Sequence, residues 1–146
     1  MSDPLYRLDL LRLAADARGA GRLSAPHATG QAYNPACGDR VIADLAFVDE
    51  CVAEFAHETK ACVLTQASAS ILGGVLRGIT RGTLEKLRRD VMAMLDSKQQ
   101  MLPGPFERYS VFAGAIEYPN RHRCVLLPIE AVLDAFAQRA KNESDS

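Results

Sequence analysis

The chain has 146 residues, 48% of them hydrophobic, and a formal net charge of −1. This length and apolar content are sufficient for one compact domain with its own core. The basic residues are scattered along the chain, so the charge pattern predicts neither a nucleic-acid-binding surface nor a surface for anionic membranes. We therefore expect no nucleic-acid partner and no membrane partner.

The first 19 residues, MSDPLYRLDLLRLAADARG, predict a helix. Ser2 or Asp3 is its expected N-cap, and Pro4 occupies its first turn, where the missing N–H costs nothing. Charged residues interrupt this segment where a signal peptide would be apolar. No run in the chain approaches the roughly 20 apolar residues that span a bilayer. We expect a cytoplasmic protein.

The next part of the chain predicts a small β-sheet. A loop is expected to extend to Gly30, and residues 31–38 are expected to be extended. Residues 40–59 alternate between apolar and polar side chains, with a plausible reversal at Asp49 and Glu50. We interpret residues 40–59 as two antiparallel strands.

From Leu64 onward the apolar residues follow helical spacing, and this helix is expected to fade around Gly78. Gly73 and Gly74 within it indicate close packing against another backbone segment. Thr83 is the expected cap of a further helix.

Two more helices are expected after the LPGPF stretch that begins at Leu102. The first is short and carries Phe106 and Phe112, and the second starts near Pro128. Residues 1–141 are interpreted as a single domain, and residues 142–146 as a disordered tail.

Four cysteines occur, and in a reducing compartment they are expected to be free thiols or metal ligands rather than disulfides. They are Cys37, Cys51, Cys62 and Cys124. In YNPACGDR, Cys37 precedes Asp39 by two residues, and the intervening glycine lets the backbone turn so that both side chains face one point.

Cys62 lies just before the helix at Leu64, and Cys124 lies just before the helix expected at Pro128. The positive end of a helix stabilises a thiolate, which is the metal-binding form of cysteine. If these helix starts pack beside the loop of Cys37, three thiolates and one carboxylate meet. That set suits zinc or an iron–sulfur cluster. The alternative interpretation is that these cysteines are buried core residues.

Three motifs together resemble the iron–sulfur cluster scaffold family of IscU and the N-terminal domain of NifU. They are CGDR at residues 37–40, ACVLTQASAS at residues 61–70 and YPNRHRC at residues 118–124. The chain looks most like the SufU branch, with a SufU-type insertion between its second and third motifs. The resemblance covers nearly the whole chain. It implies an α+β fold, in which an antiparallel sheet of about three strands packs against helices on one side.

The resemblance also implies a site. Its metal ligands fall on Cys37, Asp39, Cys62 and Cys124, and its cofactor is Zn2+ or a [2Fe-2S] cluster. We expect Cys37 to be the sulfur acceptor, because it lies on a loop that can swing. Arg121 is a candidate for charge contact with the partner, and its alternative interpretation is an ordinary solvated arginine.

The implied partners are a cysteine desulfurase of the SufS or NifS type, and apo iron–sulfur proteins or downstream carriers. The implied function is a zinc-bound sulfur relay or a cluster scaffold, rather than a stand-alone enzyme. The alternative function is a zinc-binding adaptor that regulates a partner without moving sulfur. A hydrolytic zinc enzyme is disfavoured because no H-E-x-x-H pairing is present.

The remaining candidates are expected to have structural roles. Cys51 has no counterpart in the family and is interpreted as a structural thiol. His27 and His57 are isolated histidines, and His122 is one place away from the family's histidine position, which is Arg123 here. None of these histidines is assigned as a ligand. The small residues of QASAS fit a helix packing face.

Overall fold

The computed structural model describes residues 8–36, 38–97, 102 and 104–144. Its elements in chain order are α1 (Leu8–Asp16), β1 (Ala28–Asn34), β2 (Asp39–Val48), β3 (Cys51–Lys60), α2 (Val63–Val75), α3 (Arg81–Ser97), the 3₁₀ helix η2 (Phe106–Ala115) and α4 (Pro119–Ser144). The expected N-cap at Ser2 or Asp3, the first-turn Pro4 and Cys37 lie outside the described residues. Helix α4 continues to Ser144, into the segment expected as a disordered tail.

The three strands form one antiparallel sheet in the order β1-β2-β3. The predicted reversal at Asp49 and Glu50 is confirmed, since β2 ends at Val48 and β3 begins at Cys51. Asp49 has a φ of 55°, in the left-handed region that Asp tolerates better than most residues. The turn therefore needs no glycine.

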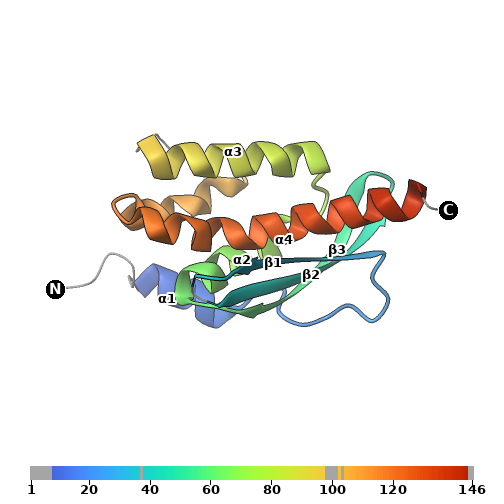
Figure 1. Cartoon of the computed structure of the whole chain (residues 1–146), viewed down its shortest axis with the longest axis horizontal. Coiled ribbons are helices and arrows are strands. Elements are labelled where there is room, and N and C mark those ends of the chain that lie inside the picture. The colour runs from blue at the N-terminus through green and yellow to red at the C-terminus, as the bar shows by residue number, and fades with distance from the viewer. Residues whose placement is uncertain (1–7, 37, 98–101, 103, 145–146) are drawn as a thin grey trace.

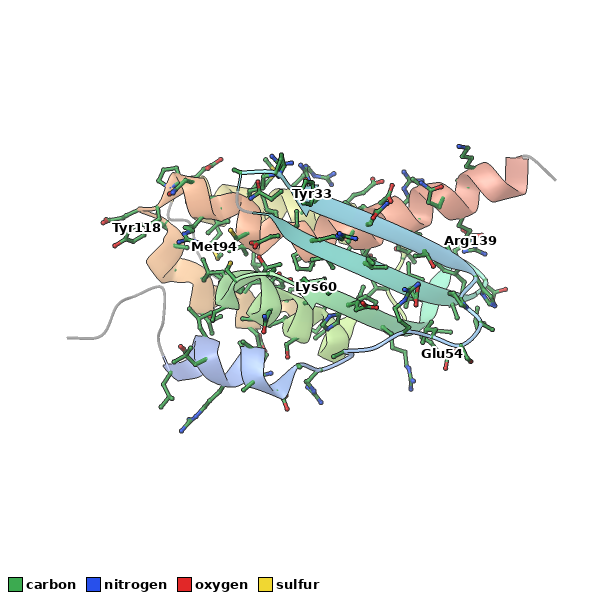
Figure 2. The ribbon with its side chains drawn as sticks, turned by 60° about the horizontal axis from the view of Figure 1, so that its bottom comes forward. Tyr33, Glu54, Lys60, Met94, Tyr118 and Arg139 are labelled. Carbon is green, nitrogen blue, oxygen red and sulfur yellow. The ribbon has the colours of Figure 1, made fainter. Side chains whose placement is uncertain are left out.

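Helices cover one face of this sheet. Figure 1 shows α4 lying along the sheet, with α3 stacked on the far side of α4, and α2 contacts both β3 and α4. Helix α1 packs against α2, burying Leu10 and Leu13 and leaving Leu8 and Leu11 exposed. Figure 2 looks toward the opposite face of the sheet, over which none of the described helices lies. The expected α+β architecture is confirmed.

Strand β1 begins at Ala28, within the segment that was expected to be a loop. The expectation treated Gly30 as a turn residue. A Cβ at this position would overlap the carbonyl of Ala131 and the backbone of Ala135, so α4 lies directly on the strand here. Gly30 permits a close approach between helix and strand rather than a turn.

The close packing against backbone that was expected at Gly73 and Gly74 is confirmed at Gly73, whereas Gly74 lies against a side chain. A Cβ on Gly73 would overlap the Arg18 carbonyl, and one on Gly74 would lie 2.7 Å from the Arg18 guanidinium. Helix α2 thus presses against the segment that follows α1.

The expected cap of α3 is wrong by three residues. Helix α3 begins at Arg81, and the Thr83 backbone N–H donates to Thr80 Oγ1 at 3.3 Å. A side-chain oxygen that receives an N–H three residues later is the usual N-cap arrangement. Thr80 is therefore the cap, and Thr83 lies in the first turn.

The expected start of the last helix is also wrong. Helix α4 begins at Pro119, and Pro128 lies inside it. Proline was taken as a start signal because it lacks an N–H and has a fixed φ. Hydroxyl groups from α2 supply hydrogen bonds to α4 carbonyls near this proline, from Thr65 to Cys124 and from Ser68 to Val125.

Among the described residues, no helix is long and apolar enough to cross a membrane.

Candidate metal centre

Three of the four expected ligands lie together. One ligand atom from each of Asp39, Cys62 and Cys124 lies within 4.8 Å of the others. Asp39 is 7% exposed and Cys124 is 1% exposed, whereas Cys62 is partly exposed. The cluster is therefore mostly buried and reaches solvent on the side of Cys62. The fourth expected ligand, Cys37, lies outside the described residues.

Asp39 is placed by the turn that joins β1 to β2. The Gly38 N–H donates to the Asn34 carbonyl at 2.8 Å, and the Ala36 N–H donates to Asn34 Oδ1 at 3.2 Å. Gly38 has a φ of 76°, a conformation that favours glycine. The sequence expectation that glycine turns the chain before Asp39 is confirmed.

Cys62 is the residue that precedes α2, as expected, and it has extended backbone angles. A hydrogen bond with Cys124 is the largest cause that lowers the pKa of Cys62 to about 6. The hydroxyl and N–H of Thr65 lower this pKa further, against burial and the charge of Asp39. The lowered pKa favours the thiolate, which is the metal-binding form of cysteine.

Cys124 does not lie before a helix, contrary to the expectation. It lies inside α4, because this helix starts at Pro119. The positive end of a helix acts only over the first turn. The positive end of a helix therefore stabilises a thiolate at Cys62, at the start of α2, and not at Cys124. What places Cys124 in the cluster is the packing of α4 against α2 and the sheet.

The donor set fits a thiophilic cation. Two thiols and one carboxylate are ligands that zinc and iron accept, and a tetrahedral zinc site places its sulfur atoms about 3.8 Å apart, from a Zn–S length of about 2.3 Å. The ligand atoms of this cluster lie within 4.8 Å of one another, so small side-chain movements would bring them to that spacing. Cys62, Cys124 and Asp39 are thus residues that could hold zinc or iron.

Thr65 is a site residue that the sequence reasoning missed. Its hydroxyl oxygen lies 3.5 Å from Cys62 Sγ, 3.4 Å from Asp39 Oδ2 and 3.0 Å from the Cys124 carbonyl oxygen. The side chain is fully buried. Thr65 is the third residue of α2 and Cys62 its N-cap, a spacing at which the two side chains can meet, and this spacing is the signal that could have found it.

The histidines have other partners. His57 Nε2 bonds the Arg18 carbonyl at 2.8 Å, His27 Nδ1 accepts the Phe47 N–H at 2.9 Å, and His122 Nε2 lies 2.9 Å from the Ala115 carbonyl. None of the three belongs to the ligand cluster found among the described residues. These contacts agree with the expectation that the histidines are not ligands.

Basic and aromatic side chains lie around the cluster. Arg40 pairs with Lys60 across the sheet, and Arg123 Nη2 lies 3.4 Å from the Tyr33 carbonyl. Figure 2 shows Tyr33 and Lys60 at one end of the sheet, with Glu54 and Arg139 at the other end.

Arg121 lies in the first turn of α4 and is half-buried. Cys51, the first residue of β3, lies outside the ligand cluster.

The family model of the NifU-like N terminal domain matches residues 5–125, which is most of the chain and includes both described cysteines of the cluster. The chain belongs to this NifU-like family.

Individual relatives agree with that placement. The chain is 24% identical over 117 residues to the iron–sulfur cluster assembly scaffold protein IscU of Streptococcus pyogenes serotype M1, covering 75% of this chain and 69% of that protein. The crystal structure of the N-terminal part of a NifU-like protein from Brucella abortus superposes with a TM-score of 0.89 at 32% identity, covering 95% and 96% of the two chains.

A SufU protein from the thermophile Fervidobacterium islandicum AW-1 has a similar fold. Its structure superposes with a TM-score of 0.82 at 20% identity, covering 92% of this chain and 98% of that one. At this identity the likeness concerns the fold of this NifU-like chain. The family expected from the three motifs is confirmed.

Proposed function

We propose that this NifU-like chain is an iron–sulfur cluster assembly scaffold of the IscU, NifU and SufU type. The single observation that carries the proposal is the convergence of Asp39, Cys62 and Cys124, whose ligand atoms lie within 4.8 Å. Membership of the NifU-like family and similarity to a scaffold named IscU support it. Cys37 completes the proposed ligand set, and it stands two positions before Asp39 in the chain.

The proposed cargo is sulfur, delivered as a persulfide by a cysteine desulfurase. The Cys37 thiolate attacks the outer sulfur of the enzyme's persulfide, so that a new S–S bond forms on Cys37. The S–S bond of the enzyme breaks, and its cysteine leaves as a thiolate. The step exchanges one persulfide for another, so it needs no oxidant or reductant.

The ligand set is compatible with two forms of the protein. Zinc, when bound, keeps the ligating thiols deprotonated. In the other form, iron and sulfide are built into a [2Fe-2S] cluster as cargo and passed to apo iron–sulfur proteins or downstream carriers. In both forms Asp39 supplies an oxygen ligand, which exchanges more readily than a thiolate on these metals. A cytoplasmic location belongs to the same proposal, because free thiols persist in a reducing compartment.

Arg121 is proposed to contact the desulfurase. It lies three residues before Cys124, in the first turn of α4. An arginine there can pair with a carboxylate of a protein that approaches the cluster, and guanidinium–carboxylate pairs give geometric specificity. Arg121→Glu is expected to weaken sulfur transfer while leaving metal content unchanged.

Sulfur transfer is the experiment that tests the proposal. The protein is mixed with a cysteine desulfurase and cysteine, and persulfide is located by peptide mass spectrometry. We expect one added sulfur atom on the peptide that carries Cys37, and none on the peptide that carries Cys51 in the same sample. Cys37→Ser is expected to abolish the transfer. Zinc-loaded protein that stimulates the enzyme without gaining sulfur would instead favour the regulatory adaptor.

A further inference from the structure

Pro128 stands four residues after the proposed ligand Cys124, inside α4. In an α-helix the carbonyl of one residue accepts the N–H of the residue four positions later. Proline has no N–H. Because residue 128 is proline, no N–H at that position can bond the Cys124 carbonyl.

The missing donor comes from the neighbouring helix. Helices α2 and α4 contact each other (Figure 1), and the Thr65 hydroxyl donates to the Cys124 carbonyl oxygen at 3.0 Å. Thr65 and Cys124 are 0% and 1% exposed, so this bond is shielded from water. A buried carbonyl that lost its helical donor without replacement would be destabilising, and the Thr65 hydroxyl supplies the replacement.

The same hydroxyl touches two other proposed ligands, Cys62 Sγ at 3.5 Å and Asp39 Oδ2 at 3.4 Å. One side chain therefore connects the start of β2, the start of α2 and the interior of α4. A helical N–H at position 128 would satisfy the Cys124 carbonyl within its own helix. The link between the two helices would then be redundant.

We propose that Thr65 and Pro128 are a pair of positioning residues for the metal centre. Pro128 frees the carbonyl of Cys124, and the Thr65 hydroxyl binds that carbonyl and fixes the Cys124 thiol relative to Cys62 and Asp39. The inference rests on the proposed metal site. Removing a hydrogen bond that orients metal ligands usually costs about 10–100-fold in metal affinity.

Valine is the matched replacement for Thr65, because it keeps the branched shape and removes the hydroxyl. Zn2+ affinity is measured by competition with a chelator, and the ligand set is read from the absorption spectrum of the Co2+-substituted protein. We expect Thr65→Val to bind Zn2+ about 10–100-fold more weakly and to show altered Co2+ bands. Thr65→Ser restores the hydroxyl and is expected to restore both. If the valine variant does not fold, Thr65→Ala takes its place.

Ser68 supplies the control. It lies one turn further along α2, is fully buried, and its hydroxyl donates to the Val125 carbonyl at 2.7 Å. Ser68→Ala thus removes a hydroxyl bond between the same two helices, together with the bond between Ser68 Oγ and the Tyr109 hydroxyl at 2.9 Å, and Ser68 is not one of the clustered ligands. We expect it to lower the free energy of unfolding and to leave Zn2+ affinity unchanged.

Pro128→Ala tests the second half of the pair. Alanine restores an N–H that can reach the Cys124 carbonyl, so Thr65→Val is expected to cost several-fold less affinity in this background than in the wild-type chain. An equal cost in both backgrounds would show that Pro128 has no part in the arrangement.

Three further outcomes would overturn the proposal. Thr65→Val with wild-type Zn2+ affinity and an unchanged Co2+ spectrum contradicts the role of Thr65 while leaving the metal site intact. An equal loss in Ser68→Ala shows a general effect of helix packing. Wild-type protein that binds neither ion overturns the proposed metal centre itself, and the inference with it.

Discussion

At the scale of single residues, Asp44 shows how the chain buries a carboxylate away from the metal centre. It is fully buried, and its oxygens accept bonds from Arg22 Nε at 2.6 Å, Thr29 Oγ1 at 2.7 Å and the Leu23 N–H at 3.1 Å. Burial raises the pKa of Asp44, but these hydrogen bonds and the charge of Arg22 together outweigh it and lower the pKa. The interaction joins the loop after α1 to the middle of β2.

Acid should therefore weaken the fold through Asp44. The pKa of Asp44 in the folded chain lies below the unfolded value of about 3.9. The contribution of Asp44 to the free energy of unfolding is therefore complete above the unfolded pKa and is lost as pH falls through the folded pKa. We expect Asp44→Asn to lower the free energy of unfolding by about 1–3 kcal/mol at neutral pH. The variant should also lose less stability than the wild type between neutral pH and acid.

Urea unfolding at several pH values measures both effects. Glu58→Gln is the matched control, because Glu58 reaches Arg22 at 3.7 Å from an exposed position and should change stability much less. Parallel pH profiles for the wild type and Asp44→Asn would contradict the assignment.

At the scale of elements, glycine has opposite roles in two helices. Gly73 of α2 faces the Arg18 carbonyl, with no room for a Cβ, whereas a Cβ on Gly82 of α3 would meet nothing within 4 Å. The contact of α2 with the segment after α1 thus requires a residue without a side chain at position 73. At Gly82 only the flexibility of glycine matters.

Alanine substitutions should separate these roles. Gly73→Ala is expected to destabilise the protein by about 1–3 kcal/mol, because backbone must move to admit the methyl group. Gly82→Ala is expected to stabilise it by about 0.5–1 kcal/mol through helix propensity. Thermal unfolding of both variants tests the pair, and equal effects of the same sign would contradict the packing described here.

The elements also show where sequence reasoning succeeds and where it does not. The hairpin of β2 and β3 was predictable because its alternation is long and its reversal is local. The start of α4 was not, because the carbonyl that would accept an N–H from position 128 is instead bonded by Thr65, far away in the sequence. The glycine at residue 30 was likewise taken for a loop, because its reason is the later helix α4.

The candidate site was likewise predicted only in part from the motifs. Asp39, Cys62 and Cys124 come together as expected. The setting of Cys124 was wrong, and Thr65 was not found, because a hydroxyl's partners are known only once the helices are packed. The role of Cys37 and that of Arg121 stay predictions.

At the scale of the whole molecule, one core joins all the elements. The buried apolar cluster includes residues from each of them, from Leu10 of α1 and Ala28 of β1 to Ile129 of α4. We propose that the chain folds as a single domain. The three described ligands come from β2, the start of α2 and α4, so the complete ligand set exists only in the folded chain.

Metal binding should accordingly stabilise the fold. An ion that binds only the folded state adds about 2.7 kcal/mol when its free concentration is 100 times the dissociation constant. We expect Zn2+ to raise the melting temperature of the wild type and a chelator to reverse the shift. Cys62→Ala should show a much smaller shift, and a full shift in this variant would place the ion elsewhere.

The metal centre of Asp39, Cys62 and Cys124 is tested first by the metal and acid-labile sulfide content of protein purified without oxygen. We expect either about one zinc per chain or iron and sulfide in equal amounts. Either content should be lost in Cys62→Ala and Cys124→Ala and kept in the control Cys51→Ala. Full metal content in Cys124→Ala would contradict the shared site of Asp39, Cys62 and Cys124.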